Sequence, residues 1–582
     1  MRATFAGLNT MVRGIMANQL SLDTTGHNIT NAGTEGYSRQ VVTLATTYAE
    51  ERPSLHGTVI VGTGVDALAV NRARDVYADI QYRNENPTQQ YYKTLSTNYD
   101  KLETIFNDSQ NLGIEEAINK FYQNWVDVST MASNSASRTQ VIEQGRELSD
   151  RIQAAAADLQ EQIRSEYRDI ESELKQIDDI LEEISIFNNQ ILSQEVTGAQ
   201  ANDLRDRRDV LVDKLSDYLN IDIHENEFGG YQINSGGVTL VNGPSRAHLV
   251  MSNGVSSSNF GVDYGVTDYN IKVKESNIVF VPQNGILKAR LDAIAEDKDY
   301  IDKLANMASF FLSTFNDQHK QGWDLDGHSK TDSSGNVVPD TINFFGQTDL
   351  KYEYRYDPET KSNYLYRYDD PSDATKGELL SGVRIIDALE VNVKFNENRG
   401  DRYIAAATSK EYVETAAGVG TWQDMPWNNR TGDGTNAVYM SELFNIPMET
   451  IISDDRANAE VYKNALLRNK DGNYIDEDGN VVTAANAVYA TPITKLSINA
   501  YYEQSMSHLG INAYSVDVNY QAMQDVITQI QNWRDSTAGV DWNEELTNMI
   551  KFQKGFGSCS RCLNAMDEML DRLVNSTGVV GR

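Results

Sequence analysis

Apolar residues recur at alternating spacings of three and four near the C-terminal end of the chain. The positions are Met549, Phe552, Phe556, Cys559, Leu563, Met566, Leu570 and Leu573. Polar and charged residues fill the remaining faces, as in a helix that keeps one apolar seam toward a partner helix. We therefore predict a helix within 541–582 that must bury this seam against another helix.

The same register occurs at the opposite end of the chain. The positions are Phe5, Leu8, Val12, Ile15, Leu22 and Ile29, and only Gln19 and Gly26 interrupt them. Heptad helices at both ends of the chain favour a fold in which the two terminal helices pair in one coiled coil. All residues between them would then extend outward from that coiled coil. The alternative is that each helix only covers the core of its own domain.

Between the ends, a period near 3.6 alternates with a period of two. Helical patterns cover 74–131 with a break at Asn86-Pro87, then 137–193, 199–219, 285–321 and 512–535. The 137–193 pattern has no proline or glycine after 146, so it predicts one continuous helix of about 80 Å. Short strands are expected within 41–75, 221–240 and 270–282, with glycine pairs at 229–230 and 236–237 as turns.

Residues 325–505 differ in composition from the helical segments. Six tyrosines alternate with other residues between 352 and 368, on both sides of Asp357-Pro358-Glu359-Thr360. This pattern predicts a hairpin with one tyrosine-rich face. We interpret the whole segment as an inserted, mostly β module that is acidic and faces outward.

The expected fold class is α+β: an elongated multidomain chain with a terminal coiled coil, a long helical bundle with a small sheet, and an inserted mostly β domain. The expected domains are 1–75 and 506–582, which together form a discontinuous stem, 76–324 as a helical rod with a small sheet, and 325–505 as the insert.

The formal net charge of −33 argues against nucleic acid and against anionic membrane surfaces as partners. No apolar stretch reaches the length of a membrane span. The N-terminal segment has neither a continuous hydrophobic region nor a small-residue cleavage site, so an ordinary secretory signal is not expected. If the protein is exported, another route must recognise it.

A search for catalytic or metal-binding patterns finds only incomplete ones. Cys559 and Cys562 are the only cysteines and lack a second ligand pair, and they are interpreted as small buried residues on a helix face. His224-Glu225 lacks the second histidine of a zinc-protease motif, since Phe228 stands in its place. The acidic turns at 324–327 and 476–480 lack the ligand series of a calcium loop. We therefore expect no enzyme, no cofactor and no metal.

One polar segment follows the first helix. It comprises Asn28, Ile29, Thr30, Asn31, Ala32, Gly33, Thr34, Glu35, Gly36, Tyr37, Ser38, Arg39 and Gln40. It is similar to the segment shared by rod, hook and hook-associated proteins, and the chain thus resembles the bacterial flagellar axial protein family. The ending Gly36-Tyr37-Ser38-Arg39-Gln40 is typical of its hook-associated members.

Three further blocks resemble hook-associated members. They are Asn202–Asp209 with the glycine-rich strands to Gly243, the turn Gly322–Gly327, and Ser536–Glu545 leading to Gln553 and Arg561. Together the resemblance covers about 1–327 and 505–582. The alternating charges of Asn202–Asp209 are typical of a solvated or salt-bridging face. Cys559 and Cys562 depart from the family, which usually has small or aliphatic residues there.

The resemblance implies a structural role at the junction between hook and filament. The implied partners are further copies of this chain, the hook protein, hook-associated protein 3 and an export chaperone. The implied location is extracellular, after type III export in an unfolded state without a cleaved signal peptide. Terminal seams left unpaired in the monomer would fold on assembly, so both termini are expected to be protease-sensitive until the chain assembles.

Two other functions remain open from the sequence. Another axial rod or hook protein shares the Asn28–Gln40 segment, but should lack the 137–193 helix and the Asn202–Asp209 block. A secreted adhesin could instead use the tyrosine-rich insert at 325–505 to bind glycans.

Overall fold

The structure is a computed structural model of the full chain. The residues that it describes are 6–54, 57–106, 113–196, 198, 200–254, 262–332, 335–348, 350–357, 362–368, 377–416, 419–448, 450–451, 463–464, 480–483 and 496–576. Phe5, the hairpin turn at 358–360 and the acidic turn at 476–479 lie outside these ranges.

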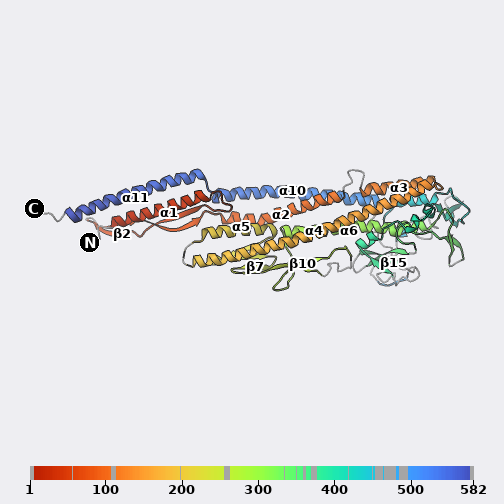
Figure 1. The fold of residues 1–582 in the computed structure, drawn as a ribbon, viewed down its shortest axis with the longest axis horizontal. Coiled ribbons are helices and arrows are strands. Elements are labelled where there is room, and N and C mark those ends of the chain that lie inside the picture. Colours follow the sequence, from red (N-terminus) through yellow and green to blue (C-terminus); the bar gives the residue numbers. More distant parts are fainter. Residues whose placement is uncertain are drawn as a thin grey trace.

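The molecule is strongly elongated, and both ends of the chain lie at the same end of it (Figure 1). That end, called the stem here, contains α1 (Ala6–Asn31) and α11 (Trp542–Ser576). Two antiparallel strand pairs accompany them: β1 (Gln40–Thr46) with β4 (Val65–Arg72), and β2 (Glu50–Ser54) with β3 (Gly57–Val61). The expected elongated α+β fold is confirmed.

The middle of the molecule, called the rod here, is a helical bundle. Its members are α2 (Val76–Ile105), α3 (Ile114–Thr130), α4 (Ser135–Glu195), α5 (Asn202–Tyr218), α6 (Ile286–Phe310), a π-helix (Phe311–Phe315), α7 (Asn316–Lys320) and α10 (Ile498–Ala538). The predicted continuous helix is confirmed as α4, whose 61 residues span about 90 Å at 1.5 Å per residue. Its inward positions, such as Leu148, Ile152 and Leu159, are fully buried against neighbouring helices.

The predicted helix break at Asn86-Pro87 is wrong, because α2 runs through Pro87 without interruption. A proline removes one backbone donor, which a helix tolerates when its neighbours hold the turn in place. Here the side chain of Asn86 donates hydrogen bonds to Ser216 Oγ (2.9 Å) and Asp217 Oδ1 (2.6 Å) of α5. Packing against α5 therefore holds this turn of α2 in helical form, although the sequence pattern predicted a break there.

A small antiparallel sheet lies on one side of the rod. Its strand order is β5 (Asp222–Glu225), β6 (Tyr231–Ser235), β7 (Val238–Asn242) and β8 (Ser245–Arg246). Gly236 and Gly237, with φ of 55° and 80°, make the tight turn between β6 and β7 that the sequence predicts. Beside the sheet, β9 (Leu249–Asn253) and β10 (Tyr269–Val273) form a hairpin. The further strand expected near 278–280 is reduced to a single bridge between Lys272 and Val279.

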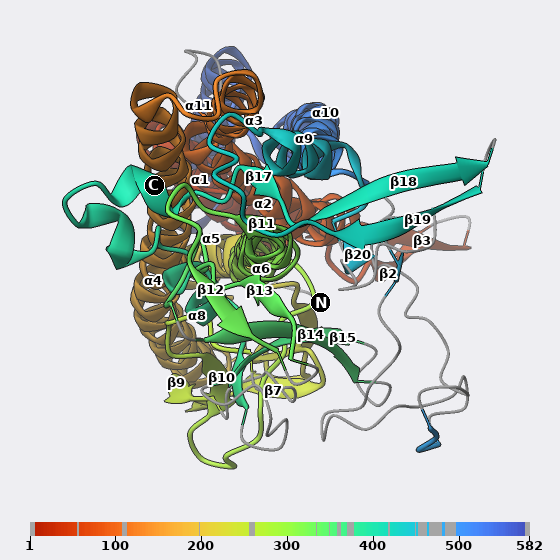
Figure 2. The same cartoon turned by 90° about the vertical axis from the view of Figure 1, so that its right-hand side faces the viewer.

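The segment after the rod contains short strands and helices. They are β11 (Gly322–Trp323), β12 (Ser329–Thr331), β13 (Val337–Pro339), β14 (Lys351–Asp357), β15 (Ser362–Tyr368), β16 (Glu378–Leu380), α8 (Val383–Asp387), β17 (Ala407–Thr408), β18 (Lys410–Ala416), β19 (Val419–Asp424), α9 (Thr435–Glu442), β20 (Thr450–Ile451) and β21 (Lys463–Asn464), with 3₁₀ turns at Val393–Asn396, Gly400–Tyr403 and Leu443–Asn445. Figure 2 shows β18 and β19 projecting from this end of the molecule.

The predicted tyrosine hairpin exists as β14 and β15, but its single tyrosine-rich face does not. The register pairs Tyr352 with Arg367 and Tyr366 with Glu353, so Tyr352 and Tyr366 lie on opposite faces of the hairpin. Tyr352, Tyr366 and Tyr368 are also buried, at 4%, 8% and 2% exposure. Neither observation supports an exposed aromatic platform for glycans.

The core of this segment is continuous with the core of the rod. Phe121 of α3 contacts Phe315, Phe344, Phe345 and Phe444, with ring centroids 5.4–5.9 Å apart. All five rings are essentially buried. The parts of this segment around Phe344, Phe345 and Phe444 therefore pack onto the rod.

Candidate functional site

The two helices from the ends of the chain pack antiparallel in the stem. The two helices approach so closely at Gly14 and Gly7 that there is little room for a side chain. A methyl group added at Gly14 would lie 3.0 Å from Cys559 Sγ, and one at Gly7 would overlap the side chain of Met566. A methyl group at Gly555 would likewise overlap Asn18. These contacts advance evenly along both helices, so α1 and α11 keep one register over the stem.

The stem contacts include two predicted seam positions of α11, namely Cys559 and Met566. In α1 the contacts above fall at Gly7 and Gly14, one residue before the predicted positions Leu8 and Ile15. Among the predicted seam positions that the structure describes, Phe556 is 37% exposed. The others are all intermediate in exposure: Leu8, Val12, Ile15, Leu22, Ile29, Met549, Phe552, Cys559, Leu563, Met566 and Leu570. Phe5 and the side chain of Leu573 lie outside the described residues.

Small residues in α1 therefore form a seam that the hydrophobicity pattern did not reveal. Gly7, Gly14, Ser21 and Asn28 recur every seven residues, and that spacing was visible in the sequence. Small residues allow helix backbones to approach closely, but they bury little apolar area.

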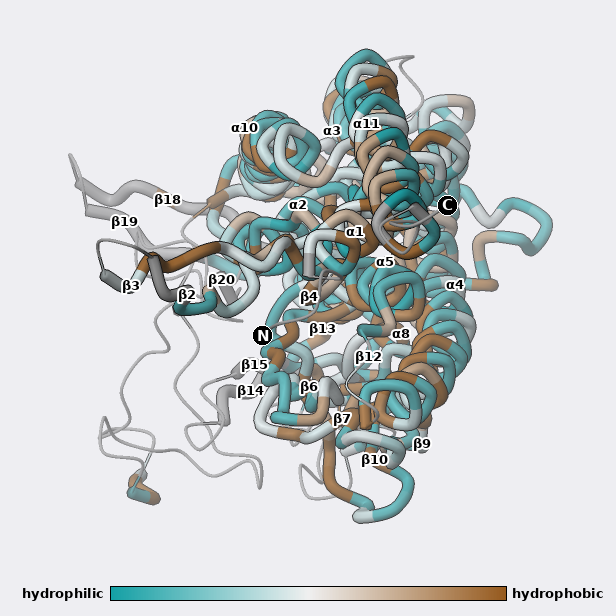
Figure 3. The backbone as a smooth tube through the Cα atoms, turned by 90° about the vertical axis from the view of Figure 1, so that its left-hand side faces the viewer, coloured by the Kyte–Doolittle hydropathy of each residue, from teal (hydrophilic) through white to brown (hydrophobic). Residues whose placement is uncertain are grey.

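The stem has a thin core compared with the rod. Among the described residues of α1 and α11, Ala17 is the only fully buried apolar side chain. Exposed apolar side chains include Met16 (64%), Ile550 (58%) and Met569 (58%). Figure 3, which views the molecule from the stem end, shows hydrophobic positions recurring along both helices among hydrophilic ones. Hydrophobic burial therefore stabilises the isolated stem far less than the rod.

The Asn28–Gln40 segment forms the connection from stem to rod, called the joint here. Asn28 is 1% exposed and sits at its centre. Its Oδ1 accepts hydrogen bonds from Gln40 N (2.9 Å) and Tyr37 Oη (2.8 Å). Its Nδ2 donates to Gln40 O (2.9 Å) and to Glu545 Oε2 (3.2 Å). One amide thus ties the end of α1, the following turn and the start of α11 together.

The remaining motif residues reach outward from this centre. Ser38 donates from its backbone N and its hydroxyl to Asp206 of α5, at 2.9 and 2.7 Å. Arg39 binds Glu545 (2.7 Å) and Glu544 (2.5 Å) of α11. Gln40 donates to Asp203 at 2.8 Å.

Gly36, Tyr37 and Asn31 shape the turn itself. Gly36 has φ of 72°, and a methyl group there would overlap Val210 of α5, so a side chain would be both strained and crowded. Burial, together with the charges of Asp203, Asp206 and Glu545, raises the pKa of Tyr37 and keeps it protonated as a donor. Asn31 donates to the carbonyl of His27 at 3.0 Å near the end of α1.

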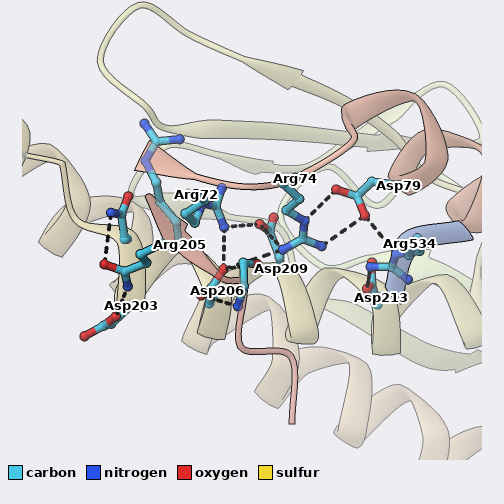
Figure 4. Close-up of polar contacts among 12 residues, drawn as sticks. Arg72, Arg74, Asp79, Asp203, Arg205, Asp206, Asp209, Asp213 and Arg534 are labelled. Carbon is cyan, nitrogen blue, oxygen red and sulfur yellow. Dashed lines mark hydrogen bonds and ion pairs between the residues drawn. The ribbon is translucent and has the colours of Figure 1, made fainter. Parts of the chain in front are cut away.

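Next to the motif lies a largely buried network of four arginines and four aspartates, all but Arg83 labelled in Figure 4. The arginines are Arg72, Arg74, Arg83 and Arg534, and the aspartates are Asp79, Asp206, Asp209 and Asp213. The charges balance, and the residues come from the end of β4, from the short connection that follows it (Arg74), and from α2, α5 and α10. Of the two readings of Asn202–Asp209, salt bridging is confirmed for Asp206 and Asp209, while Asp203 and Arg207 are exposed.

Asp209 is the centre of this network. It is 2% exposed and binds Arg72 (2.7 Å), Arg74 (2.9 Å) and Arg83 (3.2 Å). It also accepts a hydrogen bond from Tyr231 Oη at 2.8 Å. Burial alone would raise the pKa of Asp209, but the charges of Arg74, Arg83 and Arg72 outweigh it and hold that pKa well below its usual range.

The Arg534 side chain extends the network to the last long helix of the rod. It bridges Asp79 of α2 (2.8 Å) and Asp213 of α5 (2.5 Å), just before α10 ends. The backbone N of Arg39 also donates to Ala538 O at 2.9 Å. Sequence spacing could not reveal these contacts, because some of the paired residues, such as Asp79 and Arg534, are 455 positions apart.

The remaining candidate chemical groups have structural surroundings. Cys559 packs at Gly14, whereas the expected burial of Cys562 is wrong because that thiol is exposed. Asp324 is buried and accepts hydrogen bonds from the backbone N of Asp326 and of His328 within its own turn. Within the described ranges, no cluster of three or more His, Cys, Asp or Glu side chains could hold a metal ion. In those same ranges no helix is long and apolar enough to cross a membrane.

Comparison with known proteins adds independent evidence. Residues 99–333 match the family model of the flagellar hook-associated protein FlgK helical domain. Residues 534–576 match that of the flagellar basal body rod FlgEFG protein C-terminal region. The flagellar hook-associated protein 1 of Bacillus subtilis (strain 168) is 25% identical over 609 aligned residues, covering 100% of both chains. That of Salmonella typhimurium is 23% identical, covering 98% of this chain and 99% of the relative.

A solved structure supports the fold. The flagellar hook junction protein FlgK from Burkholderia pseudomallei matches with a TM-score of 0.54 and 14% identity, covering 79% of this chain and 100% of that one. Together with the stem and the joint, these likenesses define a structural protein of the bacterial flagellum, not an enzyme. Within that class, the chain is similar along its whole length to flagellar hook-associated protein 1 (FlgK) of other bacteria.

Proposed function

We propose that this chain forms the junction between the flagellar hook and the filament, and that it assembles with copies of itself through the stem. The stem carries the proposal. Its two helices contact each other through small residues, while their apolar stripes remain only half-buried in the monomer. Neighbouring stems would supply the missing apolar contacts, so that assembly and stem ordering are coupled.

The joint gives this stem a defined direction. Asn28, Arg39 and the Arg–Asp network connect α1 and α11 to α2, α5 and α10 through buried hydrogen bonds and ion pairs. A stem held at a fixed angle to its rod presents the same surface in every copy. Repeating heterologous contacts around an axis then build a closed ring or a tube.

The proposed partners are further copies of this chain, the hook protein on one side and hook-associated protein 3 on the other. The proposed location is the outside of the cell, at the end of the hook. In this proposal the chain leaves the cell unfolded through the type III apparatus, with help from an export chaperone. It keeps residues 6–31, because they form α1 of the stem.

The test is electron microscopy of purified hooks incubated with the full-length protein or with a variant lacking Met549–Arg582. We expect the full-length protein to cap hook ends and the truncated one to leave them bare. A variant with Asp222→Asn, at a side chain that is 72% exposed, serves as a matched control that should still cap. Capping by the truncated protein, or no capping by either form, would overturn the proposal.

A further inference from the structure

One side of the rod carries an exposed apolar ridge along α10. Its residues are Ile511, Tyr514, Val518, Val526 and Trp533, at 61%, 72%, 45%, 37% and 43% exposure. Their spacings of three, four, eight and seven place them on one face of the helix. At the end of the ridge nearest the stem, the ring centroid of Trp533 lies 5.7 Å from that of Tyr77 of α2. A solvent-facing stripe of this length on a rod is typical of a surface that meets a partner.

The charge around this ridge is acidic. Asp525 and Asp535 are exposed on α10, and the helix contains no lysine. Its one arginine, Arg534, is engaged by Asp79 and Asp213. A partner surface for the ridge should therefore combine apolar groups with a basic edge.

Such a surface exists on another side of the same rod. A groove of about 790 Å³ runs between residues 164–179 of α4 and the β9–β10 hairpin. Apolar residues line it, among them Leu174, Val250, Met251 and Val266. Figures 1 and 2 place α10 and this hairpin on opposite sides of the rod, at a similar level along its length.

The α4 edge of the groove is basic at its Arg164–Arg168 end, whereas three of the four charged lining residues farther along the helix are acidic. Arg164, Arg168 and Lys175 are 46%, 64% and 73% exposed there. Their ion pairs with Glu161 and Glu171 lie at the surface, where such pairs contribute at most about 1 kcal/mol and exchange easily. Glu171, Asp178 and Asp179 also line the groove, and Arg246 already binds Asp178 at 2.6 Å.

We propose that the α10 ridge of one copy docks into the α4/β9–β10 groove of the next copy. This inference rests on the proposed self-assembly and names the surfaces that mediate it between rods. Two different surfaces on opposite sides of one subunit make a heterologous contact, which is what a closed ring requires. The apolar ridge would fill the groove, and the basic Arg164–Arg168 end of its edge would face Asp525 and its neighbours.

The test uses two single-cysteine proteins in a Cys559→Ser, Cys562→Ser background. One carries Tyr514→Cys on the ridge and the other Lys175→Cys at the groove. They are treated with a short bismaleimide, separately and mixed, both on hook ends and in concentrated protein without hooks. We expect covalent dimers in the mixture and roughly tenfold fewer in either protein alone, as for a contact that needs both surfaces.

A charge test adds a second readout. Arg164→Glu with Arg168→Glu should lower the cross-linking yield about tenfold, because it sets like charges against the acidic ridge. Arg207→Glu, an exposed arginine on α5 away from the groove, is the matched control and should leave the yield unchanged.

The outcomes separate this inference from the proposed function. Hook capping without mixed dimers overturns the ridge-to-groove contact and leaves the junction role standing. Mixed dimers in concentrated protein without hook capping support the contact and overturn the junction role. Dimers of the Tyr514→Cys protein alone point to a two-fold contact between ridges and overturn the inference. Absence of both capping and dimers overturns both.

Discussion

Replacing Asp209 by asparagine should loosen the joint more than any other isosteric change in the network. The carboxylate binds Arg72, Arg74 and Arg83 at 2.7–3.2 Å and is 2% exposed. Asparagine keeps the shape but removes the charge, so three largely buried guanidinium groups lose their shared counter-ion. Removing one partner of a buried ion pair costs about 3–5 kcal/mol, and we expect a loss of that size in the free energy of unfolding.

The expected loss depends on pH in a defined direction. The arginines hold the pKa of Asp209 below its unfolded value, so its stabilising contribution is complete above the unfolded pKa of about 3.9. As pH falls below that value, the wild-type protein loses this contribution progressively. The difference between the wild type and Asp209→Asn should therefore be largest at neutral pH and shrink below about pH 4.

Urea unfolding followed by tryptophan fluorescence measures this effect, since Trp125 is buried in α3 of the rod and Trp323 is buried in the segment after the rod. Asp222→Asn, on the first strand of the sheet, is the matched control because its side chain is 72% exposed. A loss below about 1 kcal/mol at pH 7, or one equal to that of the control, would refute the view that this network holds the joint together.

Three further changes probe other parts of the molecule. Asp297→Asn should stabilise the protein by roughly 2–4 kcal/mol at pH 8 and little at pH 4, because burial raises the pKa of Asp297 to about 7 and the folded state resists its ionisation. Urea unfolding at both pH values measures the change, with the exposed Asp299→Asn as control. A gain in stability that does not depend on pH would contradict the prediction. Gly14→Leu should push α1 away from Cys559 and speed hydrogen exchange in α11. Gly26→Leu should not, because a methyl group at Gly26 has no neighbour within 4 Å. Equal exchange rates in the two variants would contradict the view that α1 and α11 pack through glycine. Asn28→Ala should weaken the stem by roughly 2–3 kcal/mol, since it leaves buried partners at Gln40, Tyr37 and Glu545 without their hydrogen bonds. Hydrogen exchange of the α1 amides measures this loss, with the exposed Asn9→Ala as control. An unchanged exchange rate would count against the role of Asn28.

Local patterns predicted the elements well where one physical signal dominated. The uninterrupted apolar spacing of 137–193 predicted α4, and the Gly236-Gly237 pair predicted the turn between β6 and β7. The pattern was misleading where a neighbour decided the outcome. Pro87 stays inside α2 because α5 holds the adjacent turn, and Tyr352 of β14 and Tyr366 of β15 lie on opposite faces because of the strand register.

The candidate site was only partly visible in the sequence. The Asn28–Gln40 segment was identified by resemblance, but its chemistry depends on Glu545, Asp206 and Ala538, which only the fold brings close. Hydrophobicity marked Leu8 and Ile15, whereas the contacts with α11 at Gly7 and Gly14 lie one residue earlier. A scale that scores apolar side chains gives no weight to glycine, although glycine allows the closest approach.

Hydrogen exchange of the stem, in free protein and in protein bound to hook ends, tests the central claim most directly. We expect the amides of α1 and α11 to exchange rapidly in the free chain, because the described part of the stem fully buries no apolar side chain larger than Ala17. On hook ends these amides should become protected, while those of α4 stay slow in both states. Equal protection of α1 and α11 in the free and bound states would contradict the view that the stem becomes ordered by assembly.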